Sequence, residues 1–296
     1  MTDPRARTRT HRKERVLLLL LSVILVAGLL SLGWNLTQLA NRSVQESGPM
    51  TPPASMPSPQ PGSSGQSGVG ASNETVMQQR VLQRSPLYDH AAPRMTDCPR
   101  AATVKTREDY EAMVRAQVDC VHEAWRPILA ELGFSQTKPA VEFFRGPGSD
   151  SACGALDAPA FYCSLAGGTL HFGDGHFAMA KQWKHSVNEM VNHEYGHHLQ
   201  SVTGMTLAKT QLGNDPEWDR RSELQTICWS AMMATHNDAI RMDAASRAGW
   251  QARFESMLAD ETHGGQESLV RWGRRGLEAR SVGECNTWTV PAEEVA

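Results

Sequence analysis

Residues 191–200 read VNHEYGHHLQ, and the spacing of the apolar side chains around this stretch predicts a helix with one face in the core. Five residues fall within about 80° of one another on a helical wheel, as is typical of a core-facing stripe. They are Val187, Val191, Tyr195, His198 and Val202. No proline interrupts residues 180–202. We therefore expect one long helix over this range.

The same stretch contains the pattern H-E-x-x-H, from His193 to His197. Two histidines four residues apart on a helix lie about 40° apart, so both can bind one zinc ion. Glu194 lies about 100° further round than His193 and could take a proton from a water molecule that the metal activates. The alternative is a histidine-rich helix without a metal. For His198, which lies in the apolar stripe, the pattern favours a packed or supporting residue.

A catalytic zinc needs a third protein ligand and an open position for water. The third histidine of metzincins would fall at position 203, which is a threonine, so we expect a carboxylate from a later helix. The candidates are Asp215, Glu217, Asp219, Glu223 and Asp238. Glu223 is surrounded by residues that favour burial, in SELQTICWSAMMA, and a buried carboxylate needs a partner such as a metal. Asp215 instead suits a helix N-cap before Pro216, and Glu217 and Asp219 suit a solvated first turn.

The rest of the C-terminal part predicts a helix-rich α+β domain with a small sheet. Four further helices are expected. Three cover residues 106–134, 242–258 and 266–279, and the fourth begins near residue 216. Two short strands are expected at 140–145 (AVEFFR) and 169–172 (TLHF), both bordered by glycine-rich turns.

The N-terminal part has the composition of a membrane anchor followed by a linker. Residues 5–15 carry six basic side chains, and residues 16–41 carry no charge. About 20 apolar residues in a helix cross the hydrocarbon core of a bilayer. We therefore expect a cytoplasmic tail (1–15), a transmembrane anchor (16–36), a linker rich in Pro, Ser and Gly (37–86) and an extracytoplasmic domain (87–296). A cleaved signal peptide, whose apolar region is usually shorter, is the alternative.

All six cysteines follow the apolar run, and none forms a C-x-x-C pair. An even number of cysteines outside the cytoplasm predicts disulfides rather than a cysteine metal site. Residues 43–296 carry 22 basic and 30 acidic side chains, a net charge of −8. Because no basic patch with interleaved aromatic residues is present, we expect no nucleic-acid partner. The sequence leaves the oligomeric state open.

Short motifs in a fixed order extend the pattern over about residues 97–290. They are CVHEAW (120–125), ACG (152–154), FYC (161–163), HEYGHHLQ (193–200), RRSELQTIC (220–228), THG (262–264), VRW (270–272) and ECNTW (284–288). In these motifs the chain resembles the neutral zinc metallopeptidases of bacteria, many of which are membrane-anchored. The resemblance implies a zincin-like domain outside the cytoplasm with one Zn²⁺ per chain. It also implies ligation by His193, His197 and Glu223, with Glu194 as general base.

The resemblance further implies a Cys153–Cys163 disulfide, and for the other four cysteines we expect Cys98–Cys120 and Cys228–Cys285. The chain departs from the family pattern at three places. Ile227 replaces an aspartate that could accept a hydrogen bond from a ligand histidine, and losing such a partner typically costs 10–100-fold in metal affinity or activity. Ser268 and Leu269 stand where the family has Gln and Arg. The segment SLAGGT (164–169) lacks the proline and aspartate that usually follow FYC.

These residues predict a membrane-anchored zinc metallopeptidase whose partners are a peptide or protein substrate and, through the N-terminal helix, a lipid bilayer. A second reading is a zinc-binding but catalytically silent surface domain that binds a partner protein, which the change at Ile227 favours and an intact Glu194 disfavours. A third is a metal-free helical domain with a chance motif. His263 either donates a hydrogen bond to the oxyanion of the reaction or is a loop residue without a catalytic part. The substrate itself cannot be read from the sequence.

Overall fold

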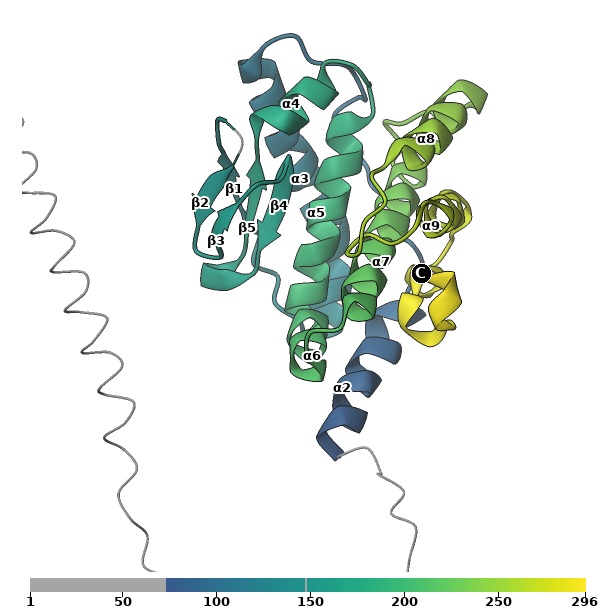
Figure 1. Cartoon of the computed structure of the whole chain (residues 1–296). Coiled ribbons are helices and arrows are strands. Elements are labelled where there is room, and N and C mark those ends of the chain that lie inside the picture. Colours follow the sequence, from purple (N-terminus) through teal and green to yellow (C-terminus); the bar gives the residue numbers. More distant parts are fainter. Residues whose placement is uncertain (1–72, 147) are drawn as a thin grey trace, which may run out of the picture. The chain divides into compact units, whose positions relative to one another are not determined.

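The computed structural model describes residues 73–146 and 148–296. The expected cytoplasmic tail (1–15), the transmembrane anchor (16–36) and most of the expected linker (37–86) lie outside these residues. Within the described ranges, no helix is both long enough and apolar enough to cross a membrane. Figure 1 shows the domain that these ranges form.

The five longest helices of the described residues frame this domain. They are α3 (Arg107–Glu131), α5 (Ser186–Val202), α7 (Pro216–Thr235), α8 (Ala244–Ser256) and α9 (Gln266–Glu278). Three of these helices begin at an N-cap whose side chain accepts a hydrogen bond from a free backbone N–H of the first turn. The N-caps are Thr106 for α3, Asp215 for α7 and Asp243 for α8. Asp215 therefore caps α7, as its position before Pro216 predicts. The helices expected over 106–134, from 216, over 242–258 and over 266–279 are confirmed.

The strands form a small mixed sheet and a separate hairpin. In the sheet the order is β1 (Ala140–Phe143), β5 (Thr169–Phe172), β4 (Ala160–Cys163), with β1 parallel and β4 antiparallel to β5. The hairpin consists of β2 (Ser149–Ser151) and β3 (Gly154–Leu156). A helix-rich domain with a small sheet confirms the α+β class. The two strands expected at 140–145 and 169–172 are β1 and β5.

Helix α5 occupies the middle of the domain, between the sheet and α7 (Figure 1). It packs against α3, β4 and α7, while α9 packs against α7 and α8. Val191, Tyr195 and His198 of α5 are fully buried, which confirms the core-facing stripe. Other elements pack against both α5 and α7. Side chains that meet between these two helices therefore project from a rigid support.

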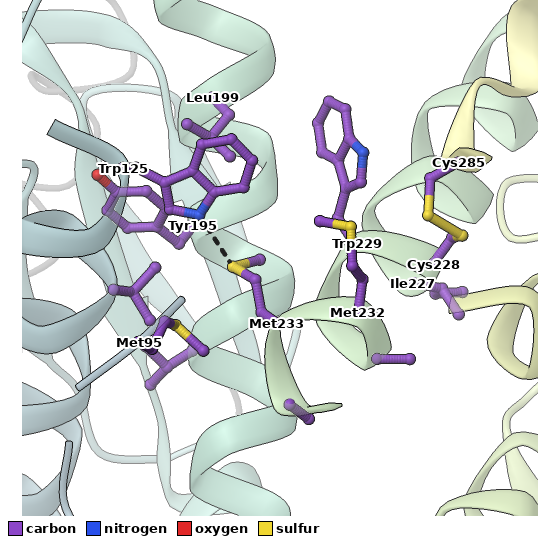
Figure 2. Packing of buried hydrophobic residues seen from close by; sticks show 14 of the residues in the cluster. Met95, Trp125, Tyr195, Leu199, Ile227, Cys228, Trp229, Met232, Met233 and Cys285 are labelled. Atoms are coloured by element: carbon purple, nitrogen blue, oxygen red, sulfur yellow. Dashed lines mark hydrogen bonds between the residues drawn. A yellow bond between two sulfur atoms is a disulfide. The ribbon is translucent and has the colours of Figure 1, made fainter. Parts of the chain in front are cut away.

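The core between α3, α5 and α7 is built from large side chains (Figure 2). Trp125 and Tyr195 are fully buried, and Trp125 Nε1 donates to Met233 Sδ at 3.2 Å. One turn earlier on α7, Trp229 Nε1 donates to the Val282 carbonyl at 3.1 Å, so this buried indole also has a partner. These contacts join α7 to α3 on one side and to the C-terminal segment on the other.

Three disulfides join Cys98 to Cys120, Cys153 to Cys163 and Cys228 to Cys285, as expected. The Cys228–Cys285 bond, visible in Figure 2, ties α7 to a 3₁₀ turn at Val282–Cys285. It spans 57 residues, and closing a loop of that length contributes about 4 kcal/mol in the chain-entropy description. The C-terminal segment is therefore anchored to the helix that carries Glu223.

Two boundaries differ from the sequence prediction. Residues 73–83, assigned to the linker, form helix α2 (Asn73–Gln83), which packs against α6 (Met205–Leu212) and buries Leu82. The short amphipathic run was hidden by the Pro/Ser/Gly-rich composition before it. The helix expected over 180–202 begins only at Ser186, after α4 (Asp174–Ala180) and a turn. Trp183 lies in that turn and packs edge-on against Trp250 of α8, which requires the chain to bend there.

The buried imidazole of His176 predicts a loss of stability in mild acid. Its Nδ1 lies 2.8 Å from the Tyr110 hydroxyl, and burial lowers its pKa to about 4. A histidine whose folded pKa lies below the unfolded value of 6.5 is protonated first in the unfolded chain, so stability falls as the pH drops from 6.5 towards 4. We expect His176 alone to cost about 2 kcal/mol of unfolding free energy at pH 5 relative to pH 7.5.

Urea unfolding at both pH values measures this effect. In the His176→Gln variant, which cannot titrate, we expect the difference in stability between the two pH values to shrink by about that 2 kcal/mol. An unchanged pH dependence in the variant would show that His176 is not the group responsible.

Candidate metal centre

The expected ligand histidines lie one turn apart on α5. The rings of His193 and His197 meet edge-on with centroids 4.9 Å apart. Their side chains are 14% and 18% exposed, so each ring is largely enclosed yet reachable from outside. Glu194 points from the same helix and is 4% exposed. The three residues of the H-E-x-x-H pattern therefore share one side of α5.

Helix α7 brings Glu223 to these rings. Glu223 Oε2 lies 3.3 Å from His193 Nε2 and 3.2 Å from His197 Nε2. The close approach depends on Gly196, because a Cβ at that position would lie 3.0 Å from the Thr226 methyl group. A larger residue would push α7 away from α5 at the point where the carboxylate reaches the histidines.

Thr226 holds the ring of His193. The Thr226 hydroxyl donates its proton to the Glu223 backbone carbonyl at 2.8 Å. Thr226 Oγ1 is therefore left as an acceptor for His193 Nδ1, which lies 3.3 Å away. With the proton of the neutral imidazole on Nδ1, the lone pair of Nε2 faces Glu223. Thr226 thus sets both the orientation and the tautomer that a metal ligand requires.

Gln200 supports His197 in the same way. Its Oε1 lies 3.0 Å from His197 Nδ1, and its Nε2 donates to the Ser222 carbonyl and to Gln225 Oε1. These two acceptors fix which end of the amide faces the ring, so His197 Nδ1 is the donor. Gln225 in turn donates to the Tyr88 hydroxyl, which extends the network away from the site.

The donor set fits a divalent metal ion. Among the described residues, two imidazole nitrogens and one carboxylate oxygen, from His193, His197 and Glu223, lie within 4.8 Å of one another. Two supported imidazoles and a carboxylate can bind such an ion and leave a position open. The expected ligands are brought together, and they can hold a metal ion.

The charges around the cluster favour a cation. Burial alone would lower the pKa of His197, but the Glu223 carboxylate outweighs it and raises the pKa to about 9. Burial works against the charged form of Glu223, yet both histidines hold its pKa well below its usual range. A proton shared between these groups is therefore favoured, and a metal ion can take that proton's place.

The other carboxylates considered as third ligand all have different partners. Asp215 Oδ1 accepts from the Glu217 backbone N–H, and the Glu217 carboxylate pairs with Arg221. Asp219 lies 2.7 Å from Lys209 Nζ, and Asp238 lies 2.9 Å from Arg94. These pairings leave Glu223 as the carboxylate of the cluster.

Glu194 and His263 border the cluster on an open cleft of about 570 Å³. Burial raises the pKa of Glu194, although the two histidines oppose that shift. His263 Nε2 lies 3.8 Å from Glu223 Oε2, and its Nδ1 lies 3.0 Å from both carboxylate oxygens of Asp260. Asp260 fixes the ring so that Nε2 faces the cluster.

His198 does not belong to the cluster. It is fully buried, and its Nδ1 lies 3.2 Å from the Tyr162 hydroxyl, as expected of a packed residue. Tyr195 is also a core residue, with its hydroxyl 2.9 Å from His122 Nδ1. These contacts brace α5 against α3 and β4.

The positions that depart from the family pattern have identifiable surroundings. Ile227 is 3% exposed and makes no hydrogen bond to either histidine, so the support of His193 comes from Thr226 instead. Ser268 Oγ donates to the Ala296 carbonyl, and Leu269 is fully buried. Residues 164–168 form a turn that begins directly after β4.

Sequence reasoning missed both residues that hold the rings. Gln200 follows His197 by three positions and Thr226 follows Glu223 by three, so each lies on the same helix face as its ligand. That spacing was the available signal. It identifies a neighbour on the same helix, but only the packing of α5 on α7 shows that Thr226 supports a histidine of the other helix.

Removal of the Thr226 hydroxyl should weaken metal binding. Thr226→Val keeps the shape and the contact with Gly196 but leaves His193 Nδ1 without its acceptor. We expect a loss of metal affinity of roughly 10-fold, at the lower end of the range for such supporting residues. Competition with a chromophoric chelator measures it. Thr226→Ser, which keeps an Oγ, should bind close to the wild type, and equal affinity in all three proteins would contradict the role.

Comparison with known proteins gives distant relatives whose functions are uncharacterized. The chain is 26% identical to uncharacterized proteins of Mycobacterium bovis and Mycobacterium tuberculosis over 228 residues, covering 71% of this chain and 72% of each relative. It is 24% identical to the uncharacterized protein YpfJ of Escherichia coli over 195 residues, covering 56% of this chain and 67% of YpfJ. No family model and no solved structure matches the chain.

Proposed function

We propose that this chain is a zinc metallopeptidase with a zincin-like domain, similar to the neutral zinc metallopeptidases of bacteria. One observation carries the proposal. His193, His197 and Glu223 converge at an open cleft, and the buried carboxylate of Glu194 lies beside them without belonging to the ligand group. Three ligands, an open side and a neighbouring base are what metal-assisted hydrolysis requires.

Zinc is the ion that this donor set suits best. Two imidazoles and one carboxylate form a known type of catalytic zinc site, whereas calcium and magnesium prefer oxygen ligands alone. All six cysteines are in disulfides, so no thiolate competes for the ion. We expect one Zn²⁺ per chain.

Zinc held by these residues would polarise the peptide carbonyl and make a bound water acidic. Glu194 accepts the proton of the attacking water and passes it to the leaving amine. Glu194 is buried beside the ligand group without belonging to it, so its carboxylate is placed to take this proton and return it. His263, held by Asp260, donates from Nε2 to the developing oxyanion when its ring is protonated on both nitrogens.

Strand β4 offers a place for the peptide. It is an edge strand of the sheet, and Ala160, Phe161 and Tyr162 of this strand line the cleft that holds the ligands. An extended peptide can add to such an edge through backbone hydrogen bonds. The substrate is therefore an unfolded peptide or an accessible loop of a protein.

The three disulfides support placement outside the cytoplasm, because such bonds persist in oxidising compartments. Together with the apolar run at 16–36, they support the proposal of a single-pass anchor with the peptidase domain on the extracytoplasmic side. The bilayer would then be a partner of the N-terminal segment alone.

The second candidate is a zinc-binding domain that is catalytically silent and binds a partner protein. The substitution at Ile227 favoured it, because a missing support weakens a metal site. Thr226 supplies that support to His193 from the neighbouring position on α7. The peptidase is therefore the better supported of the two.

Incubation of the zinc-loaded, full-length protein with a mixed peptide library tests the proposal. We expect internal peptide bonds to be cut, with one oxygen from solvent ¹⁸O-water in each new carboxylate, and all cleavage to stop when a chelator removes the metal. A protein that holds one zinc per chain and cuts no peptide in the library would instead support the silent domain.

A further inference from the structure

A second cavity of about 420 Å³ opens beside the metal cluster, towards α8 and α9. It shares His193, Glu194 and His263 with the first cleft, so a group bound at the cluster has direct access to it. Ala160 of the edge strand β4 also borders both cavities. The second cavity is therefore a side chamber of the candidate active site.

The walls of this chamber are mainly apolar. Its side chains include Met179, Met190, Ile227, Met257, Leu258 and Leu269. Ile227 and Leu269 are almost fully buried, whereas Leu258 is 79% exposed. Methionine side chains are flexible and adapt to apolar groups of different shape. The chamber therefore suits a large apolar group.

The chamber wall also holds two pairs of ionisable side chains, Arg253 with Glu189 and His263 with Asp260. Arg253 Nε lies 3.2 Å from Glu189 Oε1, and Glu189 is 4% exposed. Because Arg253 lies beside the Glu189 carboxylate and His263 beside Asp260, both carboxylates already have a basic side chain next to them. A charged side chain would lose its hydration in the chamber without gaining a free counter-ion.

Ile227 links the chamber to the ligand helix. It follows Glu223 by four positions on α7, so it lies on the same face one turn away. An aspartate there would place a charge in the chamber wall next to His193 and Glu194, which both line it. Isoleucine keeps that wall apolar, while Thr226 supports the histidine ring.

We infer that this chamber is the specificity pocket of the enzyme and takes a large apolar side chain, such as leucine, methionine or phenylalanine, of the residue next to the cleaved bond. The inference rests on the proposed function for its substrate. It assigns Ile227 and Met257 to the recognition of that side chain. Cleavage sites in the peptide library should then be enriched in these residues at one position beside the cut.

A matched pair of hydroxamates tests the pocket without relying on turnover. Each compound chelates zinc through the same group, but one carries an isobutyl side chain and the other a methyl group. Calorimetry on the zinc-loaded, full-length protein should show the isobutyl compound binding roughly 10- to 200-fold more tightly, as for other apolar pockets that distinguish side chains by a few carbon atoms.

Variants locate the effect. Met257→Asp changes a half-buried residue at the end of α8 and should reduce the preference for isobutyl by roughly 10-fold or more, as should Ile227→Asp if it folds. Leu207→Asp is the matched control, because Leu207 is 62% exposed on α6 and lies outside both cavities. That variant should keep the full preference.

Equal binding of the two hydroxamates to the wild type would overturn the inference, as would a preference that survives Met257→Asp. Binding of neither compound would overturn it as well. The proposed function fails in a different way. An isobutyl preference without cleavage of any peptide would support the pocket and contradict the peptidase activity. Cleavage without any side-chain preference would contradict the pocket alone.

Discussion

Glu223→Ala is expected to lower the zinc affinity of the protein by roughly 100-fold or more, because losing a ligand must cost at least as much as losing a residue that supports one. The variant keeps His193 and His197 but removes the negative charge that both face at 3.2–3.3 Å. Without it, the two rings must hold the cation alone. Zinc content after dialysis against a weak chelator measures the loss, and peptide cleavage should disappear with the metal.

The control for this variant must separate a lost ligand from a lost fold. Asp219→Ala changes another carboxylate of α7, one that pairs with Lys209 at the surface, and should leave the zinc content unchanged. Unfolding by urea should show both variants folded at pH 7.5. If Glu223→Ala retains one zinc per chain at wild-type affinity, the third ligand is another residue and the assignment of the centre is wrong.

Glu194→Gln is expected to lower the kcat of peptide hydrolysis by roughly 10²- to 10⁴-fold while one zinc per chain remains bound. Glutamine has the size of glutamate but cannot accept the proton of the attacking water. Glu194 is not part of the ligand group, so the metal site keeps its three donors. Measurement of kcat and of zinc content on the same preparation distinguishes the two roles.

Glu267→Gln is the matched control, because Glu267 has a side chain that is 87% exposed on α9 and lies outside the cleft. We expect it to retain both zinc and activity. Loss of zinc from Glu194→Gln would make Glu194 a ligand, and wild-type kcat in that variant would require a different base. Either result would contradict the role assigned to Glu194.

The helices and the convergence of His193, His197 and Glu223 could be predicted from sequence because their signals are local. His193 and His197 share a helix face by spacing, and Asp215 and Pro216 mark the start of α7. Glu223 could be chosen because a carboxylate among residues that favour burial needs a partner. The cysteine pairs could be matched once Cys153 and Cys163 had been assigned by resemblance to a known family.

The remaining features depend on contacts between distant segments. Thr226 supports His193 only because Gly196 allows α7 to approach α5, and no periodicity within either helix reveals that. Read alone, Ile227 looked like a lost support for the metal, but it forms part of an apolar chamber wall contributed by α5, α7, α8 and α9. Helix α2 was missed because its amphipathic pattern is short and follows a segment rich in Pro, Ser and Gly.

Titration of the metal-free protein with zinc, followed by peptide hydrolysis, tests the central claim most directly. The protein should be inactive after chelation, gain activity in proportion to added zinc and reach a plateau at one equivalent per chain. Zinc that binds at one equivalent without producing hydrolysis, or hydrolysis that does not depend on the metal, would contradict it.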